Sequence, residues 1–313
     1  MPAPDQANFQ AYDVVIVGGG PAGLSAALAL GRARRRVLLC DAGEPRNAPA
    51  HAAHNVFTRD GTPPLELLQI GRAQLQPYTT VEVAAVRVES VVRHMGHFLV
   101  TRGDGQQVTA RKLLLATGMR DELPPVAGLP ELWGTRVAHC PYCHGWEVRD
   151  QPLAIFGNGD LSSGDGGYEF VRLLAGWSRD LILCTNGPAT LNDQQRARLA
   201  AHDIPIYEAP ITRLVQQDDD LVGIHFADGS HVTRHTIFMR PRQQQRSPLP
   251  AQLGCRFTVN NLIEVDAMGH TGVPGVYAAG DITQRAQSVI AAAASGTMAG
   301  SMINHELGTE EFG

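Results

Sequence analysis

One βαβ signature near the N-terminus constrains the fold of this chain more than any other feature. The apolar run from Tyr12 to Val17 predicts a buried parallel strand, and a GxGxxG turn follows it directly. A predicted helix from Leu24 to about Ala33 and a second strand from Arg36 to Cys40 come next, and then Asp41. Glycines at this spacing allow a tight turn and let a pyrophosphate approach backbone N–H groups. The order of these parts therefore predicts a dinucleotide-binding site rather than an ordinary βαβ turn.

The predicted ligand-binding residues of this unit lie in the turn and at the end of the second strand: Gly18, Gly20, Pro21, Ala22, Gly23 and Asp41. Two later strands end in similar small turns, at Ala116-Thr117-Gly118 and at Gly280-Asp281. We expect Asp281 to hold hydroxyl groups of a ligand. Alanines and Gly296 follow on a predicted helix that runs to about Leu307, and their small size would let a flat ring system lie close.

A cysteine pair in the middle of the chain carries the second strong signal. Cys140 and Cys143 are separated by two residues, and His144 stands beside the second thiol. This spacing allows a small disulfide ring that cycles by thiol–disulfide exchange. The other cysteines, Cys40, Cys184 and Cys255, stand alone, so no second pair completes a zinc site. We therefore interpret the pair as redox-active and predict no metal; Trp146, close by, is interpreted as a core side chain.

Length and charge limit the other possibilities. A chain of 313 residues suits two domains, and a formal charge of -5 does not favour nucleic acid or an anionic membrane as a partner. The first residues lack the basic start and apolar core of a signal peptide, and no apolar run could span a bilayer. The sequence therefore predicts a cytoplasmic protein, in which an exchangeable cysteine pair is more often catalytic than structural.

A second glycine turn follows the predicted strand from Pro152 to Phe156, but its surroundings are irregular. Extra glycines stand where a helix should already have begun, so we predict the helix from Tyr168 to Ala175. The next strand, Asp180 to Cys184, ends in Thr185-Asn186-Gly187-Pro188. An NADH site needs an acid at this position, and an NADPH site needs arginines. The sequence therefore predicts either a decayed nucleotide site or one that takes a different ligand.

Taken together, these motifs resemble the low-molecular-weight thioredoxin reductase family of flavoproteins, from Tyr12 to Leu307. The segments 41–47 and 140–145 resemble a branch of that family. This branch includes dithiol oxidases of disulfide natural products and reductases that do not use pyridine nucleotides. The resemblance implies an α/β fold of two Rossmann-like, three-layer ββα domains, the second inserted in the first. The expected boundaries are 1–120 and 244–313 for the FAD domain and 121–243 for the middle, NAD(P)H-binding-like domain.

The resemblance also implies FAD, a homodimer and roles for single residues. Cys143 matches the cysteine that faces the flavin, Cys140 matches the one that attacks an external disulfide, and His144 stands where relatives carry an acidic proton donor. Gln287 matches a residue whose backbone meets the flavin ring. The full set assigned to the cofactor on motif and resemblance is Gly18, Gly20, Pro21, Ala22, Gly23, Asp41, Asn47, Val83, Ala116, Thr117, Gly118, Gly280, Asp281, Gln287 and Ser288.

These expectations predict an FAD-dependent thiol–disulfide oxidoreductase of the EC 1.8 class. Its partner would be a thioredoxin-like protein or a small disulfide or dithiol. Because the arginine-rich NADPH motif has no match, we predict a different electron source: a ferredoxin-like donor, a second flavin in the vacated groove, or substrate thiols. The alternatives are an NADPH-dependent thioredoxin reductase, a dithiol oxidase that closes a disulfide in a small metabolite, and a non-enzymatic flavin-binding redox sensor.

Overall fold

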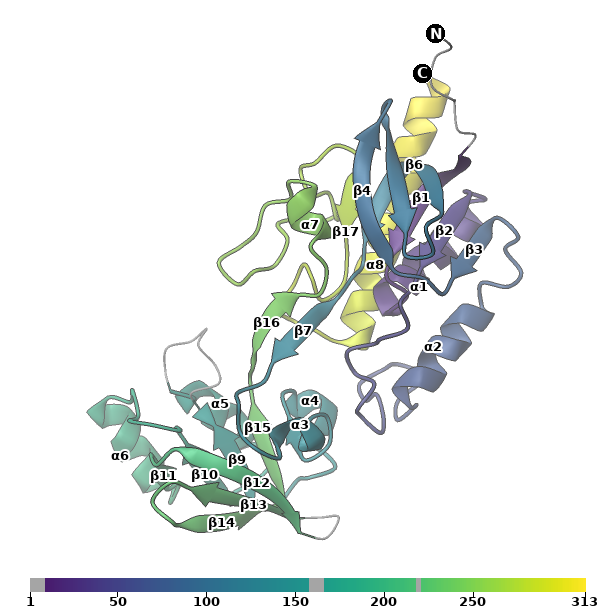
Figure 1. The fold of residues 1–313 in the computed structure, drawn as a ribbon. Helices are drawn as coiled ribbons and strands as arrows, with labels where there is room; N and C mark the ends of the chain where they lie inside the picture. Colours follow the sequence, from purple (N-terminus) through teal and green to yellow (C-terminus); the bar gives the residue numbers. More distant parts are fainter. Residues whose placement is uncertain (1–8, 158–165, 218–220) are drawn as a thin grey trace. The chain divides into compact units, whose positions relative to one another are not determined.

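The protein is described here by a computed structural model that covers residues 9–157, 166–217 and 221–313. The second glycine turn beyond Gly157 and the Asp218-Asp219-Asp220 run lie outside these residues. Contacts divide the chain into two units. Unit 1 consists of Met1–Arg46, Pro64–Arg120 and Gln245–Gly313, and unit 2 consists of Asn47–Pro63 and Asp121–Gln244 (Figure 1). The mixed α/β fold with Rossmann-like parallel sheets confirms the predicted fold class.

Unit 1 is built on one sheet with the strand order β3-β2-β1-β6-β5-β4, and β17 also pairs with β6. β1, β2, β3, β6 and β17 run parallel, whereas β4 and β5 form an antiparallel extension. The strands are β1 Gln10–Val17, β2 Val37–Cys40, β3 Val81–Ala84, β4 Val88–His94, β5 His97–Arg102, β6 Gln107–Leu115 and β17 Val276–Ala278. The helices are α1 Pro21–Arg32, α2 Pro64–Ala73, α7 Leu249–Gln252 and α8 Val289–Phe312.

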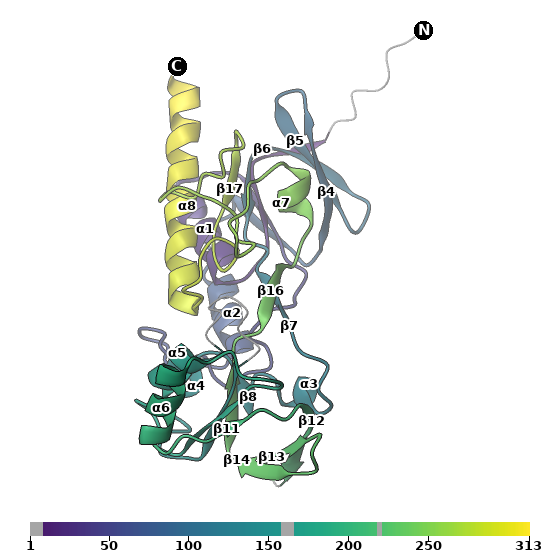
Figure 2. The same cartoon turned by 90° about the vertical axis from the view of Figure 1, so that its left-hand side faces the viewer.

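Both faces of this sheet are covered, which explains the continuous apolar run of β1. Val14 and Ile16 pack on one side with α1 and α8, and Val15 and Val17 pack on the other with β5 and the 249–282 region. α1 and α8 lie side by side, as Figures 1 and 2 both show. A sheet buried on both faces needs apolar residues at successive positions, because neighbouring side chains point to opposite sides.

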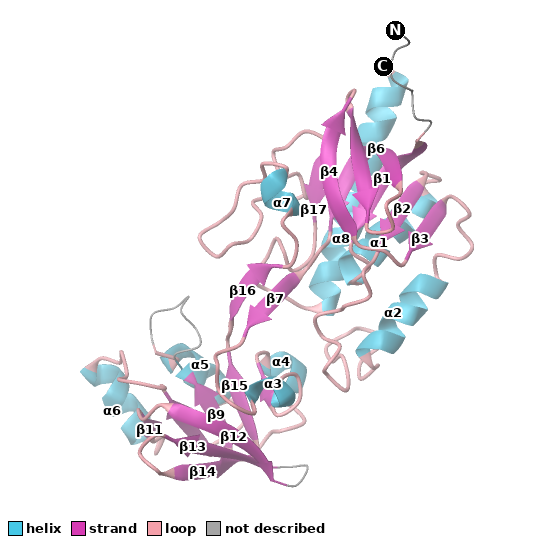
Figure 3. Cartoon of the chain, viewed as in Figure 1, coloured by secondary structure: helices cyan, strands magenta, loops and turns pink. Residues whose placement is uncertain are grey.

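Unit 2 contains a parallel sheet of order β11-β10-β9-β15-β8 and an antiparallel sheet of order β12-β13-β14. The strands are β8 Val137–Ala138, β9 Leu153–Phe156, β10 Leu181–Cys184, β11 Ile206–Tyr207, β12 Ile211–Gln217, β13 Leu221–Phe226, β14 His231–Arg234 and β15 Thr236–Met239. The helices are α3 Leu129–Leu132, α4 Pro141–His144, α5 Tyr168–Leu174 and α6 Asp193–Ala201, drawn in cyan in Figure 3. The chain passes between the units through β7, Met119–Glu122, and β16, Arg242–Gln245, which pair with each other.

The segment 47–63 belongs to unit 2 by its contacts, although the boundaries drawn from the sequence place it with the first domain. Ala53 and Thr62 form an isolated antiparallel bridge within it. Pro49 packs so closely on Gly134 that a Cβ at that glycine would lie 2.7 Å from the Pro49 Cβ. The segment therefore forms a folded loop on unit 2.

Candidate active site

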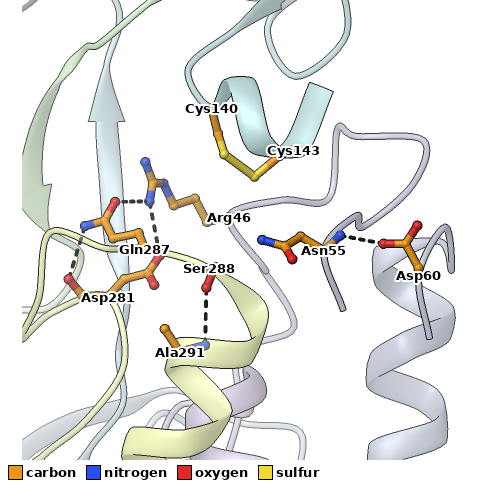
Figure 4. The surroundings of a disulfide bond; sticks show 9 residues. All are labelled: Arg46, Asn55, Asp60, Cys140, Cys143, Asp281, Gln287, Ser288 and Ala291. Carbon is orange, nitrogen blue, oxygen red and sulfur yellow. Dashed lines mark hydrogen bonds and ion pairs between the residues drawn. A yellow bond between two sulfur atoms is a disulfide. The ribbon is translucent and has the colours of Figure 1, made fainter. Parts of the chain in front are cut away.

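The cysteine pair forms a disulfide in the first turn of α4 (Figure 4). Cys140 is the N-cap of this short helix, and its Cα lies 5.2 Å from that of Cys143. The backbone N–H groups of Cys143 and His144 both donate to the Cys140 carbonyl at 3.1 Å. The local chain therefore holds both sulfurs within one turn, as exchange between dithiol and disulfide requires.

The remaining thiols are poor candidates for exchange. Cys40, Cys184 and Cys255 are all buried and free. Burial raises the pKa of Cys40 to about 11 and that of Cys184 to about 12, and it also raises the pKa of Cys255. The thiolate is the reactive form, so these side chains are nearly inert at neutral pH.

His144 is the last residue of α4 and is half-buried. Burial lowers the pKa of its imidazole, and backbone hydrogen bonds with Gly134 and Cys140 oppose this effect. Its Nδ1 atom is buried and has no hydrogen-bond partner among the described residues. A neutral imidazole with one unoccupied nitrogen can accept a proton from a neighbouring thiol.

Exposed aromatic side chains accompany the pair, and the prediction that Trp146 is a core residue is wrong. Trp146 is 67% exposed, because α4 has already ended, and the Arg149 guanidinium lies 4.0 Å from its ring centroid. Tyr142 is 63% exposed and meets the ring of Trp177 edge-on at 5.4 Å. These rings offer apolar contact area near the disulfide.

The proposed cofactor residues of unit 1 follow four adjacent parallel strands. β2, β1, β6 and β17 pair in register, with Val17 beside both Cys40 and Leu115, and Leu115 beside Ala278. The turns that follow these strands therefore meet at one edge of the sheet. In open α/β sheets, ligands bind at the carboxyl ends of the strands.

The first glycine turn has the shape that a pyrophosphate requires. Gly18 has φ +111°, and a Cβ there would lie 2.2 Å from the carbonyl oxygen of Ala116. Gly23 packs against Gly18, so a Cβ at position 23 would lie 1.9 Å from that carbonyl oxygen. At Gly20, the N-cap of α1, a Cβ would meet no atom within 4 Å. Two glycines thus hold the turn, and the third leaves the helix N-terminus open to an anion.

Thr117 and Asp41 present polar atoms at the same sheet edge. The Thr117 hydroxyl is buried without a partner among the described residues. An unpaired buried hydroxyl is costly, so it marks a place for a ligand or a water molecule. Asp41 accepts the N–H of Gly43 at 3.2 Å and forms an ion pair with Arg72 of α2. Arg72 was missed from the sequence.

Arg46 joins Asp281 to Gln287 (Figure 4). Its Nη1 donates to Asp281 Oδ2 at 3.1 Å and to Gln287 Oε1 at 2.5 Å. Gln287 Nε2 donates to the Asp281 carbonyl at 3.2 Å. Sequence analysis did not single out Arg46, whose only signal is its place in the 41–47 segment. Ser288 caps α8 by accepting the N–H of Ala291 at 3.2 Å.

Asn47 and Val83 are not residues of the turns at this sheet edge. Asn47 is the first residue of the 47–63 segment of unit 2, as Cys140, Cys143 and His144 also belong to unit 2. Val83 lies on β3 beside Leu39 and is 41% exposed. The structure therefore brings the glycine turn, Asp41, the 116–118 turn and the 280–281 turn together at one sheet edge. The roles of Asn47 and Val83 stay predictions.

The end of β10 in unit 2 is occupied by internal contacts. Thr185 Oγ1 donates to the Gly187 carbonyl at 2.6 Å, and Asn186 Oδ1 accepts the N–H of Ile211 at 2.6 Å. Arg196 of α6 folds back to this loop, where it donates to the Ala189 carbonyl at 3.3 Å. Its charge is balanced by Glu208 at 2.8 Å.

Comparison with known proteins places the chain in a family. It matches the pyridine nucleotide-disulphide oxidoreductase family over residues 12–296 and belongs to it. A thioredoxin reductase of Leptosphaeria maculans is 32% identical, with 94% of each chain covered. One from Gibberella zeae is 30% identical, over 93% of this chain and 96% of the relative. Within the family, the chain is a low-molecular-weight, thioredoxin reductase-like flavoprotein, and hence a flavin-dependent disulfide oxidoreductase.

Solved structures agree with this assignment. The structure of HlmI superposes with a TM-score of 0.89 at 39% identity, and covers 100% of this chain and 96% of its own. The structure of an oxidoreductase from Agrobacterium tumefaciens superposes with a TM-score of 0.88 at 34% identity, and covers 95% of this chain and 99% of its own. The family implies FAD, and the open glycine turn and the unpaired Thr117 hydroxyl fit that cofactor. No described helix is long and apolar enough to span a membrane.

Proposed function

We propose that this protein moves electrons between its flavin, the Cys140–Cys143 pair and an external disulfide, with no pyridine nucleotide as direct donor. One observation carries the proposal: the disulfide closes within a single turn, next to His144. The other thiols are buried and inert at neutral pH. The relatives' name points to a thioredoxin-like partner or another disulfide substrate.

The FAD site is assigned to the sheet edge of unit 1. The Gly18–Gly23 turn and the start of α1 would hold the pyrophosphate, and Asp41 would accept ribose hydroxyls. Thr117, Asp281 and the start of α8 would contact the remaining part of the cofactor. When bound, FAD supplies the two electrons that convert the enzyme disulfide to a dithiol.

The exchange with substrate is carried by the cysteines. The Cys140 thiolate attacks one sulfur of the external disulfide, which breaks the substrate S–S bond and releases one substrate thiolate. The Cys143 thiolate then attacks Cys140 of the mixed disulfide, re-forms the internal bond and releases the second thiolate. The substrate gains two electrons and two protons, and the enzyme pair loses them.

His144 accepts and donates the proton in this scheme. Because burial lowers its pKa, the imidazole is neutral at pH 7 and can take the proton of the Cys140 thiol. It then returns the proton to the departing substrate thiolate.

The end of β10 supports the proposal about the electron donor. A 2′-phosphate needs charge-assisted hydrogen bonds, which an arginine provides best. Arg196 comes to this loop, but it is engaged by Glu208. Thr185 and Asn186 are likewise engaged within the protein. A ferredoxin-like protein, a second flavin or substrate thiols would then supply the electrons.

Two measurements test the assignment of the thiols. Anaerobic titration with dithionite should consume two electrons for the flavin and two for the disulfide, and Cys140→Ser should consume only the flavin's two. In addition, Cys143→Ser should form a stable mixed disulfide at Cys140 with glutathione disulfide or a thioredoxin, detected by mass spectrometry. If the adduct forms on Cys143 of Cys140→Ser instead, the two roles are exchanged.

A further inference from the structure

The 47–63 loop is organised around the carboxylate of Asp60. Its Oδ1 accepts the backbone N–H of Asn55 at 2.5 Å and that of Val56 at 3.4 Å (Figure 4). Its Oδ2 lies 3.4 Å from Nδ1 of His54. One carboxylate thus fixes both the turn of the loop and the orientation of one imidazole ring.

The other nitrogen of His54 reaches the cysteine helix region. His54 Nε2 lies 3.5 Å from Oε1 of Glu147, so the ring bridges two carboxylates. The His54 side chain is 25% exposed. Glu147 follows His144 by three residues and lies beyond the end of α4.

Two charged groups therefore act on His144 from two different segments. Burial is the largest influence on the pKa of His144; beside it, Glu147 on the same segment raises this pKa, and His54 on the loop lowers it. Cys140 and Cys143 carry no charge while they are joined as a disulfide. The Nδ1 atom of His144 is buried and has no partner among the described residues, so solvent screens a neighbouring charge less there than at an exposed atom.

We propose that His54 is a positioning residue which engages Glu147 in an ion pair and thereby weakens the pull of this carboxylate on a proton at His144. With Glu147 held by His54, its negative charge is partly balanced and does not draw a proton onto His144. The loop thus prepares His144 to accept a proton from a thiol. This inference rests on the proton-transfer role proposed above for His144.

Substitutions of the two partners should move the pKa of His144 in opposite directions. H54Q removes the side chain that engages Glu147 and leaves this carboxylate free to act on His144, so the pKa of His144 should rise by at least about 0.5. E147Q removes the negative neighbour, so the pKa should fall by a similar amount. The measurement is the pH titration of the His144 ring signals by NMR on the oxidised protein with isotope-labelled histidine, assigned with H144Q.

H51Q is the matched control, because His51 is an exposed histidine of the same loop, and it should leave the pKa of His144 unchanged. E147D should restore a value close to that of the wild type. If the pKa of His144 shifts in the same direction in H54Q and E147Q, or shifts in neither, the inference is overturned. Glu147 is 43% exposed, so E147Q will fold and tests the idea even if H54Q does not.

A second readout separates this inference from the proposed function. In the reduced protein, alkylation of Cys140 by iodoacetamide at pH 6 should become several-fold faster in H54Q and slower in E147Q, because a charged His144 favours the thiolate. If the NMR shifts appear as expected but H144Q leaves the alkylation profile unchanged, His54 sets the state of His144, and the proton-transfer role of His144 fails. If alkylation depends on His144 but the NMR shifts are absent, only the role of His54 fails.

Discussion

At the scale of single residues, His144 makes the stability of the protein sensitive to acid. Burial lowers its pKa in the folded state, so below roughly pH 6.5 the unfolded chain takes up a proton that the folded chain does not. The free energy of unfolding should therefore fall as the pH drops through this range and be unaffected by His144 above it. H144Q should show a shallower decline in urea midpoint between pH 7.5 and 5.5. An equal slope in both proteins would contradict this prediction.

Residue types predicted the chemistry well, but not the contacts between distant segments. The cysteine pair and the glycines act through local spacing, which a sequence displays directly. Arg46 lies 235 positions from Asp281, and Arg72 lies 31 positions from Asp41. Because ion pairs of this kind depend on the path of the whole chain, nothing in the local pattern identifies them.

At the scale of elements, the contact between α1 and α8 gives a sharp prediction. A Cβ at Gly296 would lie 2.0 Å from the carbonyl oxygen of Ala22, so Gly296→Ala must push the two helices apart. We expect a loss of about 3 kcal/mol in the free energy of unfolding. Gly308→Ala is the control on the same helix, where the nearest atom is 3.8 Å away. It should gain about 0.5–1 kcal/mol. Chemical denaturation measures the free energy of unfolding of both variants. Similar values for Gly296→Ala and Gly308→Ala would refute this account.

The small residues of α8 show where element prediction from sequence was limited. The alanines and Gly296 are predicted to make room for a flat ring, and the structure shows a further role, because Gly296 and Gly300 lie against the backbone of α1. The helix also continues to Phe312, beyond the predicted end near Leu307. Its last turn is held by Lys112, which is buried and pairs with Glu306 at 3.0 Å and with Glu310. Side-chain pairs across the fold extended a helix whose own residues gave no such signal.

At the scale of the whole molecule, the fold class followed from the βαβ signature and the second set of strands. A buried parallel sheet needs apolar runs joined by helices, and this pattern is plain in the sequence. The division into units was less accessible, since the 47–63 loop groups with unit 2 only through contacts such as Pro49 with Gly134. The contacts at the end of β10 were the hardest to predict, because Arg196 reaches this loop from α6.

The electron donor depends on the molecule as a whole, and Glu208 provides a way to test it. We expect NADPH and NADH both to reduce the flavin slowly in anaerobic stopped-flow experiments. Glu208→Gln should release Arg196 for a 2′-phosphate. Because this ion pair is exposed, little is needed to break it, so flavin bleaching at low NADPH should accelerate a few-fold, and bleaching by NADH should not change.

Glu169→Gln is the matched control for this experiment, because it releases Arg172 from an exposed ion pair on α5 instead. It should leave both rates at the wild-type level. An acceleration by Glu208→Gln with NADPH alone would mean that the ion pair with Glu208 blocks a phosphate-binding arginine. Rapid, saturable bleaching of the wild-type flavin at micromolar NADPH would refute the proposal, because the 2′-phosphate would then have found its partners despite the occupied β10 loop.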